Sequence, residues 1–209
     1  MRSGALSIHP GLAAGSRLPL ARQTDAALRL SEVAVLLGAG AAAAGAAAFL
    51  DFGLRVPGHA IIRVVLPMSL GLALAPRRMA GLLMGLSAAA ATVLLKVGGA
   101  HGLGVGAVTG LVLVGPLMDL ALWRARHGSG VYLGLALAGL GANLAAMAAR
   151  AGSKLAGLDH AAARPLAAWL PQAAVTYAVC GIAAGLICSL MWFKFTAGKE
   201  DGPAAEPSR

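Results

Sequence analysis

Apolar residues dominate this chain in six long segments, which short polar or glycine-rich stretches separate. The segments cover residues 30–50, 60–76, 79–95, 102–123, 131–149 and 168–193. Most of them approach the ~20 residues that an α-helix needs to cross the hydrocarbon core of a bilayer. Several also carry Gly and Ala four residues apart, a spacing that lets membrane helices pack closely. The pattern predicts an all-α integral membrane protein, a bundle of six transmembrane helices.

The composition supports the membrane class and argues against soluble functions. Hydrophobic residues make up 58% of the 209 residues and charged residues 12%, about half the ~25% that is usual in soluble domains. Aromatic residues amount to only 4%, so surfaces on which nucleobases or flat cofactors stack are not expected. The formal charge of +9 is better explained by basic loops that set membrane topology than by nucleic acid. We expect neither a nucleic-acid partner nor a cofactor.

The distribution of Lys and Arg orients the six segments. With both termini in the cytoplasm, eleven basic residues lie on the cytoplasmic side, five lie outside, and Arg63 lies within a segment. Because cytoplasmic loops of membrane proteins are enriched in Lys and Arg, we predict cytoplasmic N- and C-termini in a bacterial inner (cytoplasmic) membrane. Three regions follow: a flexible cytoplasmic leader at 1–28, the membrane domain at 29–195 and a disordered tail at 196–209. The leader lacks the pattern of a cleaved signal peptide.

Polar residues gather at one depth, in the outer halves of the predicted helices. His59 and Arg63 lie four residues apart, on one helical face at the start of the second segment. Asn143 lies in the outer half of the fifth segment, and Gln172 and Thr176 share a face in the outer half of the sixth. Polar groups at membrane depth are costly and tend to face a cavity or one another. We therefore predict that these residues line a pocket open to the external side.

Two of these residues also have simpler interpretations. Arg63 lies only a few residues inside the membrane, where a long side chain can extend to the outer interface. Asn143 can equally join two helices by a hydrogen bond. The shared depth of the polar residues is the reason to favour the pocket.

The sequence carries no familiar signature of catalysis or metal binding. It lacks the HExxH, GxSxG and GxxxxGK[ST] motifs, so we expect neither an enzyme nor an ATP site. Cys180 and Cys188 lie eight residues apart in one segment, and a helical rise of about 12 Å excludes a disulfide between them. We assign both cysteines to the core and expect no metal site.

Residues 56–120 hold a distinctive order of features: "VPGH" before an apolar span, the turn "LAPRR", a glycine-rich loop and a span that ends in "VGP". This order resembles the substrate-binding membrane subunits (S components) of energy-coupling factor transporters, and is most similar to their cobalt and nickel uptake subunits. The resemblance implies six helices, an outward-facing pocket, and docking onto a transmembrane coupling subunit driven by ATPase subunits.

The resemblance also implies an interface on the first helix. In the family an AxxxA pattern there contacts the coupling subunit, and Ala39, Ala43 and Ala47 have that spacing here. Because this helix is so rich in alanine, packing within the bundle explains the same residues equally well.

Departures from the metal-uptake subunits argue against a metal ligand. Those subunits begin Met-His and use that histidine to hold the ion, whereas this chain begins Met1-Arg2. Arg63 also places positive charge where a divalent cation needs neutral or anionic ligands. We predict a substrate-capture subunit, surrounded by membrane lipid, that takes a small carboxylate or phosphate solute from outside for an uptake transporter. The alternative is a non-transport scaffold or accessory subunit of a larger membrane complex.

Overall fold

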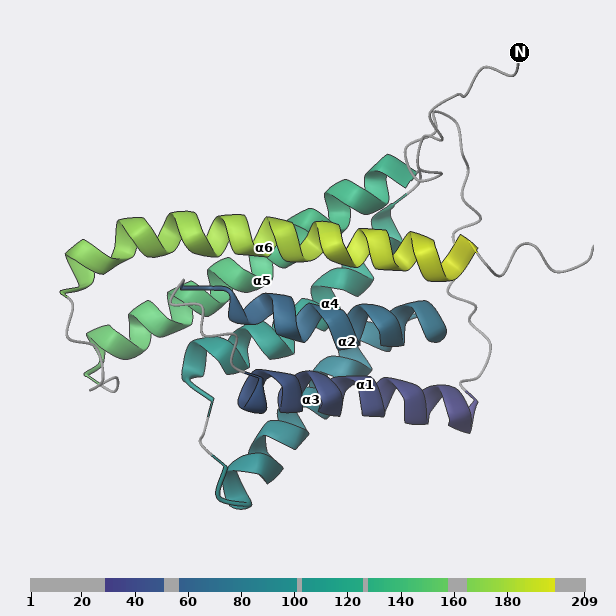
Figure 1. Cartoon of the computed structure of the whole chain (residues 1–209), viewed down its shortest axis with the longest axis horizontal. Coiled ribbons are helices and arrows are strands. Elements are labelled where there is room, and N and C mark those ends of the chain that lie inside the picture. Colours follow the sequence, from purple (N-terminus) through teal and green to yellow (C-terminus); the bar gives the residue numbers. More distant parts are fainter. Residues whose placement is uncertain (1–28, 51–56, 101–102, 126–127, 158–164, 198–209) are drawn as a thin grey trace, which may run out of the picture.

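The structure is a computed structural model that describes residues 29–50, 57–100, 103–125, 128–157 and 165–197 (Figure 1). All regular structure in these ranges is helical, as the sequence predicted. The helices are α1 (Leu30–Phe49), α2 (Ala60–Leu74), α3 (Ala80–Val97), α4 (Val105–Arg124), α5 (Gly128–Leu155) and α6 (Leu166–Ala197). The predicted leader at 1–28 and most of the predicted tail at 196–209 lie outside the described residues.

Five of the described helices are long and apolar enough to cross a bilayer, so the chain is a multi-pass membrane protein. The exception is α2, which has 15 residues. Each helix coincides with one predicted segment, and the largest differences lie at the ends of α5 and α6. Helix α5 continues to Leu155, past the predicted end at 149, because Arg150 and Lys154 interrupt the apolar pattern but not the helix.

The helices form a closed ring in which each packs against two neighbours, in the order α1, α2, α6, α5, α4 and α3. Figure 1 shows α1, α2 and α6 running nearly side by side, with α4 and α5 crossing behind them. Helix α2 also contacts α3 and α4 across the interior, and most of its residues are buried. The core therefore centres on α2. Its largest buried side chains include Met68, Leu72, Met84, Leu111, Met118 and Phe193.

Glycines that face one another bring α3 against α4, and α5 against α6, into backbone contact. A Cβ atom at Gly81 of α3 would overlap the carbonyl oxygen of Gly115 of α4, and a Cβ atom at Gly115 would overlap that of Gly81. Helices α5 and α6 meet in the same way at Gly139 and Gly181. These contacts are the close approaches that small residues permit between membrane helices. They fix the positions of α3 to α6 around the ring.

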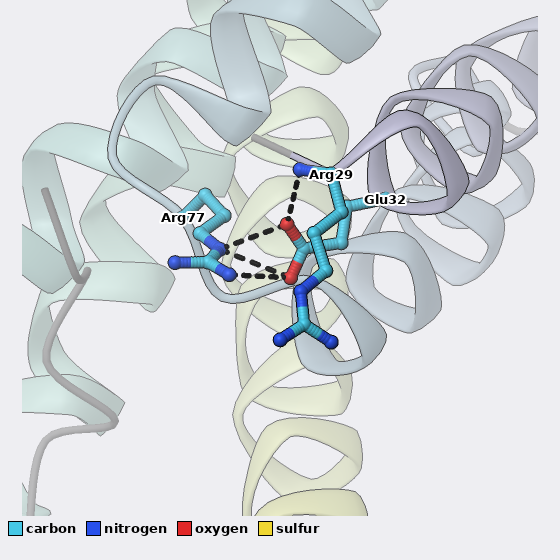
Figure 2. A network of polar contacts seen from close by, with 3 residues as sticks. All are labelled: Arg29, Glu32 and Arg77. Atoms are coloured by element: carbon cyan, nitrogen blue, oxygen red, sulfur yellow. Dashed lines mark hydrogen bonds and ion pairs between the residues drawn. The ribbon is translucent and has the colours of Figure 1, made fainter. Parts of the chain in front are cut away.

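The two ends of the bundle differ in character. At one end, on the right in Figure 1, α1 begins and α2 ends; we call it the Glu32 end. Glu32 accepts hydrogen bonds from Nη2 and Nε of Arg77, at 2.7 and 3.0 Å, and from the backbone N–H of Arg29 at 3.0 Å (Figure 2). These contacts tie the start of α1 to the turn between α2 and α3. The opposite end, where α2 begins, is the His59 end.

Candidate functional site

A cavity of about 500 Å³ lies at the His59 end of the bundle. The end of α1, the starts of α2 and α4, the second half of α5 and the first half of α6 form its walls. Its polar lining residues are His59, Asn143, Arg150, Ser153 and Tyr177. Most of the remaining lining consists of glycine, alanine and aliphatic side chains. The size and the mostly apolar lining are typical of small-molecule sites, which span roughly 300–1,000 Å³.

His59 and Arg63 form a hydrogen-bonded pair. Nη2 of Arg63 lies 2.9 Å from Nε2 of His59. A guanidinium has no acceptor, so His59 Nε2 accepts this bond and the neutral imidazole carries its proton on Nδ1. His59 lines the cavity, whereas Arg63, which is 9% exposed, is not among the described residues that do. The structure thus places Arg63 behind His59, where it orients the ring.

Asn143 lines the cavity and also joins three parts of the chain. Its Nδ2 donates to the carbonyl oxygens of Tyr177, at 2.6 Å, and of Gly58, at 3.2 Å. Gly58 has a positive φ of 86°, and a Cβ atom there would lie 2.9 Å from Tyr177. Only glycine fits this position without strain. Asn143 of α5 is therefore hydrogen-bonded to α6 and to the residues before α2, as the alternative interpretation of this residue predicts. It also lines the cavity.

Gln172 and Thr176 lie away from the cavity. Gln172 is exposed on α6, and the hydroxyl of Thr176 donates to the carbonyl oxygens of Gln172 and Ala173 in its own helix. Neither residue is among the described residues that line the cavity. The face of α6 that is turned inward carries Trp169, Ala173 and Tyr177 instead. The two predicted residues thus share a face, as their spacing indicates, but that face points outward.

The three alanines of the AxxxA pattern take part in packing within the bundle. Ala43 is fully buried, and Ala39 lies so close to Gly71 of α2 that a Cβ atom on that glycine would be 2.6 Å away. Ala47 lines the cavity. Residues on the opposite face of α1, such as Gly38 and Gly45, have no described side chain or backbone within 4 Å of the position of a Cβ atom.

Arg150, Ser153 and Tyr177 are cavity residues that the sequence did not single out. The carbon at the centre of the Arg150 guanidinium lies 5.8 Å from the centroid of the Trp169 ring, and Lys154 Nζ lies 4.6 Å from it. These are cation–π distances. Arg150 and Ser153 follow Asn143 at seven and ten residues, so extending its helical face by about three turns would have found them.

The charge of the described cavity lining is positive. Arg150 is cationic, and no carboxylate of the described residues lines the cavity. The part of the chain that the structure describes also holds no group of three or more His, Cys, Asp or Glu side chains able to bind a metal ion. This lining suits a solute with an apolar body and an anionic group.

The chain matches no protein-family model, no curated protein and no solved structure.

Proposed function

We propose that this membrane protein captures a small anionic solute in the cavity at the His59 end and delivers it for uptake. The observation that carries the proposal is the convergence of His59, Asn143 and Arg150 on one cavity of about 500 Å³. Polar side chains at membrane depth are costly unless they serve one another or a ligand. Asn143 forms hydrogen bonds between helices and also lines the cavity. Arg150 adds the positive charge that would attract an anion.

The direction of capture in this proposal rests on topology. With cytoplasmic termini, the His59 end faces outward, and the basic cluster of Arg77 and Arg78 faces the cytoplasm. The cavity is then open to solute that arrives from outside a bacterial inner membrane. This arrangement agrees with the resemblance to S components, which rely on a transmembrane coupling subunit and ATPase subunits for energy.

The experiment compares the full, tagged chain with a variant whose cavity is filled. Ala107 lines the cavity at the start of α4, so Ala107→Leu should exclude the solute. Ala90 is exposed on the outer side of α3, and Ala90→Leu adds the same volume away from the cavity. Each protein is purified in mild detergent from its native membrane, and mass spectrometry identifies the chains and small molecules that accompany it.

We expect the wild type and Ala90→Leu to retain an anionic solute and the coupling and ATPase subunits. Ala107→Leu should lose the solute but keep the partner chains at equal membrane abundance. Equal retention of the solute by Ala107→Leu would contradict capture in this cavity. Stable partner chains without ATPase subunits or solute in any sample would favour the scaffold alternative.

A further inference from the structure

The first turn of α4 forms part of the cavity wall and presents backbone hydrogen-bond donors. Gly104 is the N-cap residue of α4, with φ −62° and ψ 154°, and no side chain of the described residues caps the helix. The backbone N–H groups of the first turn have no acceptor within a helix, and Val105, Gly106 and Ala107 all line the cavity. The N-terminus also carries the positive end of the helix dipole. Such a turn attracts an oxyanion.

Arg150 of α5 lies beside this turn. A Cβ atom at Gly106 would be 3.1 Å from the Cβ atom of Arg150, so the base of the arginine side chain packs on the first turn of α4. Its guanidinium reaches the ring of Trp169 on α6. The side chain therefore extends from α4 to α6 along the cavity wall. A cation in this position reinforces the positive end of α4.

A buried polar side chain provides an independent indication of a ligand. Tyr177 is 6% exposed and lines the cavity. Among the residues that the structure describes, none is hydrogen-bonded to its hydroxyl. The hydroxyl oxygen itself is not enclosed by the protein, so a polar atom of a solute in the cavity can form a hydrogen bond with it.

The same cavity has a second helix N-terminus and an apolar interior. Helix α2 begins at Ala60 with no side-chain cap from the described residues, and His59, Ala60 and Ile61 line the cavity. Further along α2 and α4, the lining residues are Val64 and Leu111, both buried. The polar groups thus surround one part of the cavity, and aliphatic side chains surround another.

We infer that the first turn of α4 and Arg150 bind the oxyanion, a carboxylate or phosphate, of a solute whose short apolar body lies against Val64 and Leu111. The backbone N–H groups of the turn and the guanidinium donate to the oxyanion, and the Tyr177 hydroxyl bonds a polar atom elsewhere on the solute. This assignment rests on the proposed function for the identity of the cavity as a solute site. It replaces Arg63 by Arg150 as the cation that touches the solute.

The test measures binding of hexanoate and hexyl phosphate to the full chain in detergent, with hexan-1-ol as the neutral probe. Gly104→Asp should place a carboxylate at the N-cap, where it accepts from the same N–H groups. The backbone of Gly104 suits this change, and a Cβ atom there meets no described atom within 4 Å. We expect this variant to lose both anions while keeping its thermal stability. Gly104→Asn, which caps without charge, should weaken them less.

Arg150→Gln should lower anion affinity by roughly tenfold to a hundredfold, the range for a hydrogen bond to a charged group. Lys154→Gln is its matched control, because Lys154 also lies over Trp169 but does not line the cavity. This control should bind the anions like the wild type. Unchanged affinity in both Gly104→Asp and Arg150→Gln would overturn the inference.

Two further comparisons separate the oxyanion site from a lipid contact and from the uptake role. Nanodiscs with phosphatidylglycerol or phosphatidylcholine distinguish a free solute from a lipid phosphate. Stabilisation by the anionic lipid alone, with none from the soluble anions, would overturn the solute assignment.

If Ala107→Leu loses a co-purifying solute that Gly104→Asp and Arg150→Gln retain, the oxyanion site is wrong while the proposed function stands. If both variants lose hexanoate but no transport partner is found, the oxyanion site stands and the uptake role fails.

Discussion

Asp119 of α4 caps the start of α3 through the backbone of Gly81. Its Oδ1 accepts from the N–H of Gly81 at 2.9 Å, and its Oδ2 accepts from the N–H of Leu82 at 3.0 Å. The residue just before α3, Met79, has a positive φ of 66°, so the chain turns sharply before presenting these groups. A carboxylate at a helix N-terminus also interacts favourably with the helix dipole.

Removal of this cap should destabilise the protein without affecting the cavity, which lies at the opposite end. Asp119→Ala leaves two backbone N–H groups without their acceptor, at a cost of about 1–3 kcal/mol. Thermal unfolding in detergent measures the loss. Thr109→Val is a suitable control on the same helix, because the Thr109 hydroxyl bonds only the carbonyl oxygen of Val105 among the described residues. Equal stability of the two variants would mean that the cap contributes little.

The backbone contact between α3 and α4 predicts a sharp contrast between two glycines. Gly115→Ala should force α3 and α4 apart and cost about 1–3 kcal/mol or more, as overpacking does. Gly45→Ala should be neutral or slightly stabilising, because a Cβ atom there meets no described atom within 4 Å and alanine favours helices. Thermal unfolding and membrane abundance compare the variants. A well-folded Gly115→Ala protein would show that the ring tolerates wider helix spacing.

The hydrogen bond from Arg63 to His59 predicts the tautomer of the imidazole. Nitrogen NMR of labelled His59 should show the proton on Nδ1, because Nε2 accepts from Arg63. Arg63→Lys keeps a donor and should preserve this tautomer, whereas Arg63→Ala should lose the preference. If Arg63→Ala leaves the NMR signature of the wild type, then Arg63 does not orient the ring.

The sequence could predict the helices far better than their faces. In a membrane protein both the lipid and the core are apolar, so hydrophobicity marks the length of a helix but hardly its inward side. This explains α6, where the polar face of Gln172 and Thr176 points outward and the inner face is formed by Trp169, Ala173 and Tyr177. Small residues are the better guide here, because Gly181 marks the side that contacts α5.

The candidate site was predictable where polar residues are rare. His59 and Asn143 stand out against apolar neighbours, and both line the cavity. Arg150 was assigned to a loop because charged residues usually end a membrane segment, whereas α5 continues for five residues beyond it. The donors at the start of α4 belong to the backbone, so no pattern of side chains could reveal them.

Topology remains the central prediction about the protein in its membrane. Reporter fusions after Arg78 should be cytoplasmic, and fusions after Gly99 and Gly157 should be external, because cytoplasmic loops hold the excess of Lys and Arg. The fusions after Arg78 and Gly99 provide the most direct comparison, since these two residues flank α3. A cytoplasmic signal at Gly157 would mean that the fifth or sixth segment does not cross the membrane as predicted.

The short length of α2 has an electrical consequence. Its 15 residues span roughly 22 Å, less than the ~30 Å of bilayer hydrocarbon. If Arg77 and Arg78 lie at the cytoplasmic surface, as the predicted topology places them, the missing length falls at His59, where non-helical backbone lines the cavity. A charge bound there lies within the electric field of an energised membrane. Moving one charge through the full potential of 100 mV changes its energy by about 2.3 kcal/mol. With the predicted topology and a negative cell interior, an anion that enters the proposed site from outside moves against this field, so we expect weaker binding in an energised membrane than in a discharged one.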